Sequence, residues 1–248
     1  SDTPPEPIGQ RFHHLTSFTN QGYVSDDPHW GSQLPLYKSY PDAPRVSLTL
    51  PDPAALSHPQ GLPELVNKRR STRSYSDEPV SLQQLSRVLL SANGLTRMAG
   101  GSARRTAPSA GALYPIDIYI VVSEVTELEQ GLYHFNPEDS SLSRLESGDV
   151  SDQLSATSES QDWVGPAPAT LILSARFPRV TAKYADRGYR YAYIECGAIA
   201  QNIYLQTTAL GMGTVTVGAF NDQKLNEFLD VDGVREAGIL IMPIGHRN

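Results

Sequence analysis

Arginine and hydroxyl side chains gather in one short segment of the sequence, Arg69-Arg70-Ser71-Thr72-Arg73. Guanidinium groups donate paired hydrogen bonds that match phosphate oxygens, so these side chains could surround a phosphate from several sides. The same composition also suits the solvated end of a helix, where the helix dipole favours basic residues. The segment therefore indicates a small-anion site, with a basic helix end as the alternative.

A second segment places small residues between two prolines and runs directly into an apolar stretch. It reads Pro108-Ser109-Ala110-Gly111 and continues to Pro115. Small residues let the backbone approach a flat ligand closely and offer its N–H groups. Ser109 could hydrogen-bond such a ring or cap a short helix. An ordinary connection between a helix and a strand is the alternative.

A third segment, Gly211 to Phe220, is rich in glycine and contains an expected strand that ends at Gly218-Ala219. A main-chain amide there could lie close to a ligand; if that ligand is a flavin, a hydrogen bond to its N5 atom would tune hydride transfer. The glycines do not match the dinucleotide-binding fingerprint, whose third glycine lies inside a helix. A Rossmann-type site is therefore not expected.

The elements that must position these segments follow from hydrophobic periodicity. Helices are expected from Leu62 toward Lys68, from Ser81 as N-cap to Ala92, and from Ile194 to Leu210. Strands are expected at residues 116–122, 169–174, 214–217 and 239–244, with a hairpin formed by residues 132–135 and 142–145. The mixture of strands, helices and a hairpin predicts an α+β fold. The 194–210 helix is apolar all round, which predicts burial at a subunit interface.

The chain divides into two regions by composition. Residues 1–58 are rich in Pro, Ser, His and Tyr and are expected to form an extended arm, held against a neighbouring subunit or the body of its own chain. Residues 59–248 are expected to form the ligand-binding domain. Residues 98–102 are interpreted as a mobile stretch, and residues 147–162 as helix or loop.

Overall composition narrows the classes of partner. The 248 residues carry a net charge of −7, which argues against nucleic acid because phosphate backbones need a basic surface. The single cysteine, Cys196, and the scattered histidines predict no metal site and no disulfide within the chain. No apolar stretch is long enough to span a membrane, and no signal-peptide pattern is seen, so a cytoplasmic protein is expected.

Taken together, the three segments resemble those of the nitroreductase superfamily. More narrowly, residues 107–115, 131–134 and 189–202 look like the SagB-type dehydrogenases, which oxidise thiazolines and oxazolines in modified peptides. The resemblance implies a nitroreductase-like α+β fold with a central mixed or antiparallel sheet flanked by helices. It also implies FMN bound without covalent attachment, in an entwined homodimer with two sites at the interface.

The resemblance also assigns residues to the cofactor. The FMN phosphate and ribityl chain are expected to contact Arg69, Arg70, Ser71 and Arg73. The isoalloxazine is expected to be lined by Pro108, Ser109, Ala110 and Gly111, with Gly218 and Ala219 near N5. His246 and Arg247 occupy the place of a further phosphate contact. Gln201 and Asn202 could contact the flavin or pack across the dimer interface, and packing is the favoured interpretation.

Lys183-Tyr184 matches a pair that the azoline-oxidising members carry and that is implicated in catalysis. Converting an azoline to an azole removes a hydride, to FMN N5, and a proton from the adjacent carbon. A neutral lysine could accept that proton, and a tyrosine could orient the ring or relay the proton. The alternative is a surface lysine beside a tyrosine that covers a helix start.

Three functions remain open on the sequence. The first is azoline dehydrogenation in a modified peptide, with cyclase and docking partners. The second is NAD(P)H-dependent reduction of nitro compounds or quinones. The third is a flavin-binding or scaffold protein without turnover.

Overall fold

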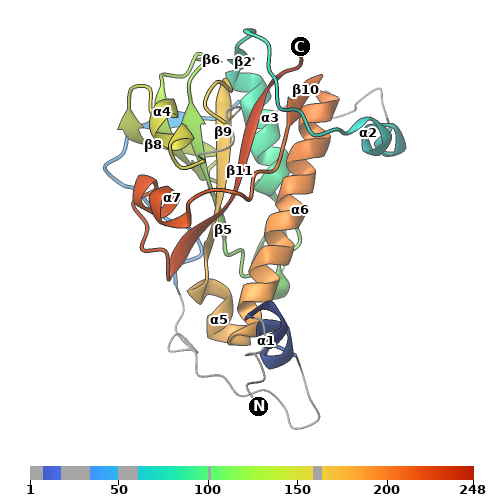
Figure 1. The fold of residues 1–248 in the computed structure, drawn as a ribbon, viewed down its shortest axis with the longest axis vertical. Coiled ribbons are helices and arrows are strands. Elements are labelled where there is room, and N and C mark those ends of the chain that lie inside the picture. Colours follow the sequence, from blue (N-terminus) through green and yellow to red (C-terminus); the bar gives the residue numbers. More distant parts are fainter. Residues whose placement is uncertain (1–7, 18–33, 50–60, 100–101, 159–163) are drawn as a thin grey trace, which may run out of the picture.

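A seven-stranded antiparallel sheet forms the centre of the molecule (Figure 1). The computed structural model describes residues 8–17, 34–49, 61–99, 102–158 and 164–248. In spatial order the strands are β1 (Arg45–Ser47), β8 (Ser141–Ser147), β7 (Gly131–Asn136), β5 (Ile116–Val122), β9 (Ala169–Arg176), β11 (Glu236–His246) and β10 (Met212–Thr214). Each neighbouring pair in this order is antiparallel.

The two central strands are buried along their whole length. β5 and β9 pair from Ile116 opposite Ala175 to Val122 opposite Ala169. Their β-branched side chains pack well on a pleated surface that is covered on both faces. The faces carry separate apolar clusters, with Ile118 and Ile120 on one side and Tyr119 and Val121 on the other.

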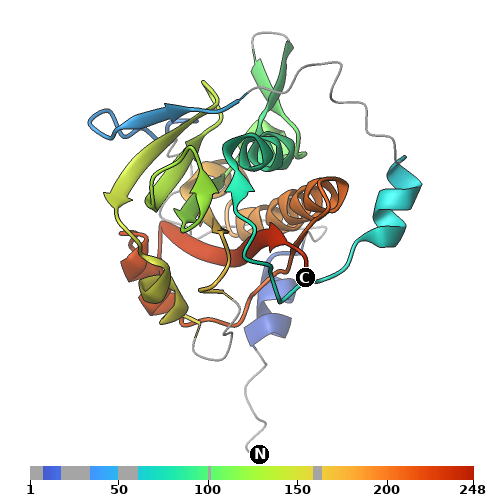
Figure 2. The ribbon, with the colours of Figure 1, turned by 90° about the horizontal axis from the view of Figure 1, so that it is seen from above.

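Helices cover both faces of the sheet. Figure 2 shows α3 (Leu82–Asn93) and α6 (Arg187–Ala209) on one side, with α4 (Ser151–Ser155) and α7 (Asp222–Phe228) on the other. α3 begins at a capping box, because Ser81 accepts from the Gln84 N–H while the Gln84 side chain accepts from the Ser81 N–H. α6 runs the height of the molecule (Figure 1), so its two ends can serve two different regions of the surface.

The remaining elements are short. They are α1 (Ile8–Leu15), α2 (Leu62–Lys68), β2 (Val80–Ser81), β3 (Leu95–Ala99), β4 (Ser102–Arg105), β6 (Val125–Thr126), α5 (Pro178–Tyr184) and the 3₁₀ turn Ala110–Ala112. β3 and β4 form a hairpin where the sequence indicated a mobile stretch. None of the helices in the described ranges is long and apolar enough to cross a membrane.

Most predicted elements are confirmed, and two differ in their bounds. The α+β class, the central sheet with flanking helices, the 81–92 helix and the 132–145 hairpin are as expected. α6 begins at Arg187 rather than Ile194. The predicted 214–217 strand is wrong in its bounds, because β10 covers Met212–Thr214 and Val217 forms only an isolated bridge to Ile241.

The described parts of the N-terminal region lie against their own chain. Arg190 of α6 donates to the His13 carbonyl at 3.0 Å, and Arg187 donates to the Thr16 carbonyl at 2.6 Å. β1 joins the edge of the sheet beside β8. Residues 18–33 and 50–58 lie outside the described residues, and the division of the chain at residue 58 stays a prediction.

Candidate functional site

The arginine-rich segment follows α2 and runs beside β10. Ser71 forms a parallel bridge with Thr214, and the Thr72 N–H donates to the Thr214 carbonyl at 2.8 Å. A Cβ atom at Gly213 would meet the Thr72 side chain at less than a van der Waals distance. Glycine at this position therefore permits the close approach that seats the segment on the strand.

Tyr204 of α6 is the side chain around which this segment is organised. The Arg69 guanidinium lies 5.0 Å from the centre of the Tyr204 ring, and the Ser71 and Tyr204 hydroxyl oxygens are 3.2 Å apart. The Thr216 N–H donates to the Tyr204 hydroxyl at 3.0 Å. Burial alone would raise the pKa of Tyr204, but its hydrogen bonds to Ser71 and Thr216 and the charge of Arg69 lower it.

Arg247, the residue after β11, lies against β10, the strand beside which the arginine-rich segment runs. Its Nε donates to the Met212 carbonyl at 2.8 Å. The Thr214 Oγ1 atom is buried and has no hydrogen-bond partner among the described residues. Guanidinium groups, hydroxyls and an unpartnered buried hydroxyl form a donor set that fits a phosphate group, as FMN carries. We call Arg69, Ser71, Tyr204, Thr214 and Arg247 the arginine cluster.

The other residues that were predicted to contact the phosphate are Arg70, Arg73 and His246. Arg70 donates to the Asn67 and Arg69 carbonyls at the end of α2, at 2.7 and 2.8 Å. Arg73 is exposed, and its charge acts on Tyr75. His246 lies with its Nε2 3.8 Å from a Glu78 carboxylate oxygen. The structure thus gathers Arg69, Ser71 and Arg247 but does not place Arg70 or His246 in the arginine cluster.

The small-residue segment forms a tight turn, residues 109–113, which we call the serine turn. Ser109 Oγ accepts from the Tyr114 N–H at 2.8 Å, and Gly111 has a φ of +62°. Arg179 of α5 donates to the Leu113 carbonyl through two nitrogens, at 2.9 and 2.6 Å. The turn is therefore fastened to the helix that ends in Lys183-Tyr184.

Lys183 and Tyr184 lie directly against Gly111. A Cβ atom at Gly111 would be 2.8 Å from the Tyr184 hydroxyl oxygen and 2.9 Å from Lys183 Nζ. Tyr184 is held in turn by an edge-on contact with Tyr191 of α6, at 4.9 Å between ring centres. The exposed Lys183 amine lies 5.4 Å from the Tyr184 ring centre. Residues far apart in the sequence thus meet in one place.

A Gly111→Ala variant should be destabilised and should displace both Lys183 and Tyr184. The left-handed backbone costs a non-glycine residue about 1–2 kcal/mol, and the added methyl group would overlap both side chains. Gly211→Ala is the matched control, since Gly211 has a φ of +73° and a Cβ added there would meet no atom within 4 Å. Urea unfolding should show the larger loss for Gly111→Ala; equal losses would mean that the contact is loose.

Gly218 and Ala219 are exposed and follow the Val217–Ile241 bridge. A Cβ at Gly218 would meet no atom of the described residues within 4 Å, which leaves this side of the backbone free for a ligand as far as those residues go. Asn202 donates to the Ala92 carbonyl at 3.4 Å, which places it as a packing residue within its own chain.

The two parts of the predicted site lie at opposite ends of α6. Tyr204 belongs to the arginine cluster, whereas Tyr191 supports Tyr184 at the other end. The stretch of helix between Tyr191 and Tyr204, at about 1.5 Å per residue, corresponds to roughly 20 Å. Figure 1 shows α5 near one end of α6 and α2 with β10 near the other.

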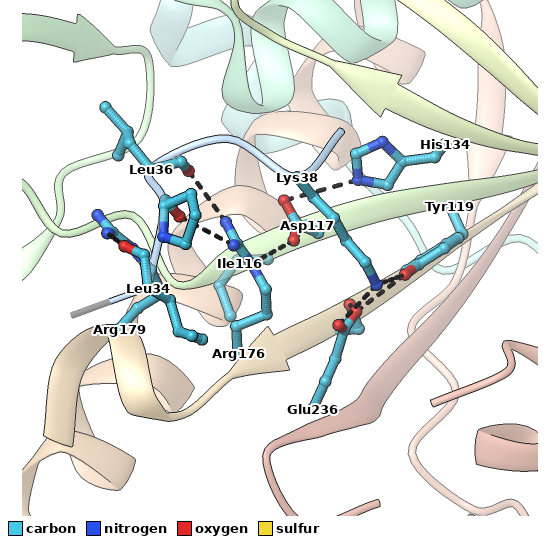
Figure 3. A network of polar contacts seen from close by, with 12 residues as sticks. Leu34, Leu36, Lys38, Ile116, Asp117, Tyr119, His134, Arg176, Arg179 and Glu236 are labelled. Carbon is cyan, nitrogen blue, oxygen red and sulfur yellow. Dashed lines mark hydrogen bonds and ion pairs between the residues drawn. The ribbon is translucent and has the colours of Figure 1, made fainter. Parts of the chain in front are cut away.

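A buried polar network was not anticipated from the sequence (Figure 3). Asp117 lies inside the apolar run of β5 and forms an ion pair with Arg176, with Oδ2 2.6 Å from Nε. Arg176 also donates to the Pro35 and Leu36 carbonyls, at 3.0 and 2.9 Å. Lys38 pairs with Glu236 at 2.7 Å. These contacts hold residues 34–40, which we call the strap, across the sheet.

Tyr204 of the arginine cluster is the other site residue that was not predicted from the sequence. It is one aromatic residue in a long apolar helix, and no local pattern distinguishes it from a core residue. The one signal in the sequence was its place on α6 a few residues before the Gly211 segment.

Known proteins share this arrangement of elements. The nitroreductase family model matches residues 66–246. A Methanocaldococcus jannaschii protein described as a nitroreductase is 41% identical over 75% of this chain and 91% of its own. The microcin B17-processing protein McbC of Escherichia coli is 26% identical over 68% of this chain and 63% of its own. A crystal structure from Ralstonia eutropha, also described as a nitroreductase, is 29% identical with a TM-score of 0.71 and covers 88% of this chain and 97% of its own. Proteins of this family typically bind flavin, and the chain is a member of the nitroreductase family.

Proposed function

We propose that the chain is an FMN-dependent oxidoreductase that dehydrogenates azoline rings, thiazoline or oxazoline to azole, in a modified peptide. The observation that carries this proposal is the contact of Lys183 and Tyr184 with Gly111. Gly111 belongs to the serine turn, which the resemblance assigns to the isoalloxazine. The pair expected to handle the substrate proton therefore lies beside the turn expected to hold the flavin.

Each residue has a definite task in this proposal. Arg69, Ser71 and Arg247 bind the phosphate of FMN through charge-assisted hydrogen bonds. Bound FMN supplies the hydride acceptor, its N5 atom. Lys183 accepts the proton from the carbon next to the one that loses the hydride, and Tyr184 orients the ring. Small side chains face the flat cofactor at Pro108, Ala110, Gly218 and Ala219.

The proposal includes a homodimer, because roughly 20 Å of α6 separates Tyr191, which supports Tyr184, from Tyr204 of the arginine cluster. A second copy would place the serine turn of one chain beside the arginine cluster of the other. Exposed apolar side chains on the helices support such a partner. They are Ile8 and Leu15 on α1, Leu62 and Val66 on α2, and Tyr193 and Ile194 on α6.

The peptide substrate is suggested by McbC, whose name describes it as processing microcin B17. Cyclase and docking partners belong to the same proposal. The NAD(P)H-dependent reductase of nitro compounds or quinones remains the second candidate, favoured by the Methanocaldococcus relative described as a nitroreductase.

The first test is the absorption spectrum of the purified protein, with mass analysis of the ligand released by heat. Flavin bands and the mass of FMN are expected. A colourless protein that takes up no added FMN would contradict the proposal and favour a scaffold without turnover.

A Lys183→Ala variant should separate azoline oxidation from generic reduction. Losing a general base lowers turnover by about 10²–10⁴-fold, so oxidation of a thiazoline-containing peptide should fall by that factor. Quinone reduction by the same variant should be nearly unchanged, since that reaction needs no proton taken from carbon. Lys224→Ala, an exposed lysine on α7, is the matched control. Equal loss of both activities would argue against a base at Lys183.

A further inference from the structure

Arg105, at the end of β4, is a buried cation without hydrogen bonds to its guanidinium group among the described residues. The residue is only 6% exposed, and none of its three guanidinium nitrogens has a hydrogen-bond partner there. The guanidinium lies 5.5 Å from the Tyr37 ring centre and 4.7 Å from the Tyr114 ring centre. The rings stabilise the charge through their faces. In the described part of the chain the guanidinium N–H donors of Arg105 therefore remain unused, at a cost in free energy.

Glu195 of α6 is a second buried group with an unused atom close to the serine turn. The residue is 2% exposed, and its Oε1 atom has no hydrogen-bond partner in the described part of the chain. Burial raises the pKa of Glu195 to about 7, although the Ser109 hydroxyl, Arg105, the Ile116 N–H and Arg179 all act to lower it. An acid of this kind changes its charge across neutral pH.

The charged and titratable groups that act on Glu195 belong to several elements. Arg105 belongs to β4 and Arg179 to α5, and the adjacent Cys196 thiol, with a pKa raised by burial, is the neighbouring titratable group on α6. Asp117 and Arg176 act on Arg105 from the sheet, as Tyr37 does from the strap. Ionised Glu195 could therefore accept hydrogen bonds from Arg105, whose guanidinium nitrogens have no partner among the described residues.

The serine turn connects these groups to the candidate catalytic pair. Ser109 interacts with Glu195 and accepts from the Tyr114 N–H, which closes the turn. Arg179 donates to the Leu113 carbonyl at the end of the turn. Gly111, in the middle, lies against Lys183 and Tyr184. A change in the charge of Glu195 will therefore act, through the serine turn, on Lys183 and Tyr184.

We propose that Glu195 is a positioning residue, which when ionised pairs with Arg105 and holds the serine turn, through Ser109, against Lys183 and Tyr184, and which loosens the turn when protonated. The ionised pair gives both orphaned groups the hydrogen bonds that each lacks. The catalytic consequence rests on the proposed function, whereas the movement of the turn does not.

The test follows the carboxyl group and the turn separately in the full chain. Infrared difference spectra should show a protonated carboxylic acid that ionises near neutral pH in the wild type and is absent from Glu195→Gln. Arg105→Met should move that midpoint upward, because removing a cation disfavours the carboxylate. Deuterium uptake by residues 107–115 should be several-fold slower in the wild type than in Glu195→Gln at pH 8, where the carboxylate is ionised, and equal at pH 6. Glu227→Gln, exposed on α7, is the control.

Two results would overturn the proposal: no carboxyl titration in the neutral range, or equal uptake by wild type and Glu195→Gln at both pH values. For catalysis, the kcat of azoline oxidation by the wild type should change between pH 6 and pH 8, and that of Glu195→Gln should change less. A wild type without azoline turnover would contradict the proposed function alone, because the infrared and exchange results would still decide the role of Glu195.

Discussion

An Asp117→Asn variant is expected to lose about 3–5 kcal/mol of unfolding free energy at neutral pH, the usual cost of removing one partner from a buried ion pair. Asp117 is 4% exposed and Arg176 is 5% exposed. Asparagine keeps the shape but leaves Arg176 as a buried cation without a counter-charge. Arg105 and Arg179 lie close enough for their charges to repel it.

Urea unfolding of the variant should be compared with that of Asp139→Asn. Asp139 forms an ion pair with Arg45, but its side chain is 52% exposed. Such exposed pairs contribute about 0–1 kcal/mol, so the control should change little. Since Arg176 also holds the Pro35 and Leu36 carbonyls, Asp117→Asn should make the strap more susceptible to proteolysis. A loss below about 1 kcal/mol would show that Asp117 is not needed to compensate these cations.

The pH dependence of this effect follows from the pKa of Asp117. Burial acts to raise that pKa, but Arg176, His134 and Arg105 hold it well below its ordinary value of 3.8. A carboxyl group with a depressed pKa stabilises the fold above the unfolded-state pKa and loses that contribution as pH falls. The difference between wild type and Asp117→Asn should therefore be constant from pH 5 to pH 8 and should shrink only in stronger acid.

Replacing both Arg69 and Arg247 by alanine is expected to raise the Kd for FMN by about 10²–10⁴-fold. Each charge-assisted hydrogen bond to phosphate contributes about 1.5–3 kcal/mol, and each 1.4 kcal/mol is a factor of ten. Arg69 follows α2 and lies over the Tyr204 ring, and Arg247 follows β11 and donates to the Met212 carbonyl of β10. The single variants should each show part of the loss.

Fluorescence titration of FMN-stripped protein measures this effect, with riboflavin as the matched ligand. Riboflavin has no phosphate, so its affinity should be almost the same for the wild type and the double variant. Arg144→Ala is the matched protein control, because Arg144 is an arginine of β8 that pairs with Glu129 instead. If riboflavin and FMN lost affinity equally, the arginine cluster would not be the phosphate site.

Local sequence determined the central elements of this protein. β-branched runs specified β5 and β9, and Ser81 with Gln84 specified the start of α3. In these segments each residue's preference agrees with its final environment, so pattern and structure coincide. The arginine-rich and small-residue segments were also recognisable, because phosphate binding and close backbone approach require particular residue types in a short space.

The tertiary structure alone decided which distant residues meet. No local pattern near Gly111 predicts its contact with Lys183 and Tyr184, and none near Arg69 predicts its contact with Tyr204. Asp117 stands in an apolar strand, and its partner Arg176 lies on a strand that pairs only in the folded sheet. Contacts of this kind depend on the order of strands and the path of α6, which short-range patterns do not encode. Burial then sets the charge of groups such as Glu195, because only the folded chain removes them from water and so raises the pKa of a carboxyl group.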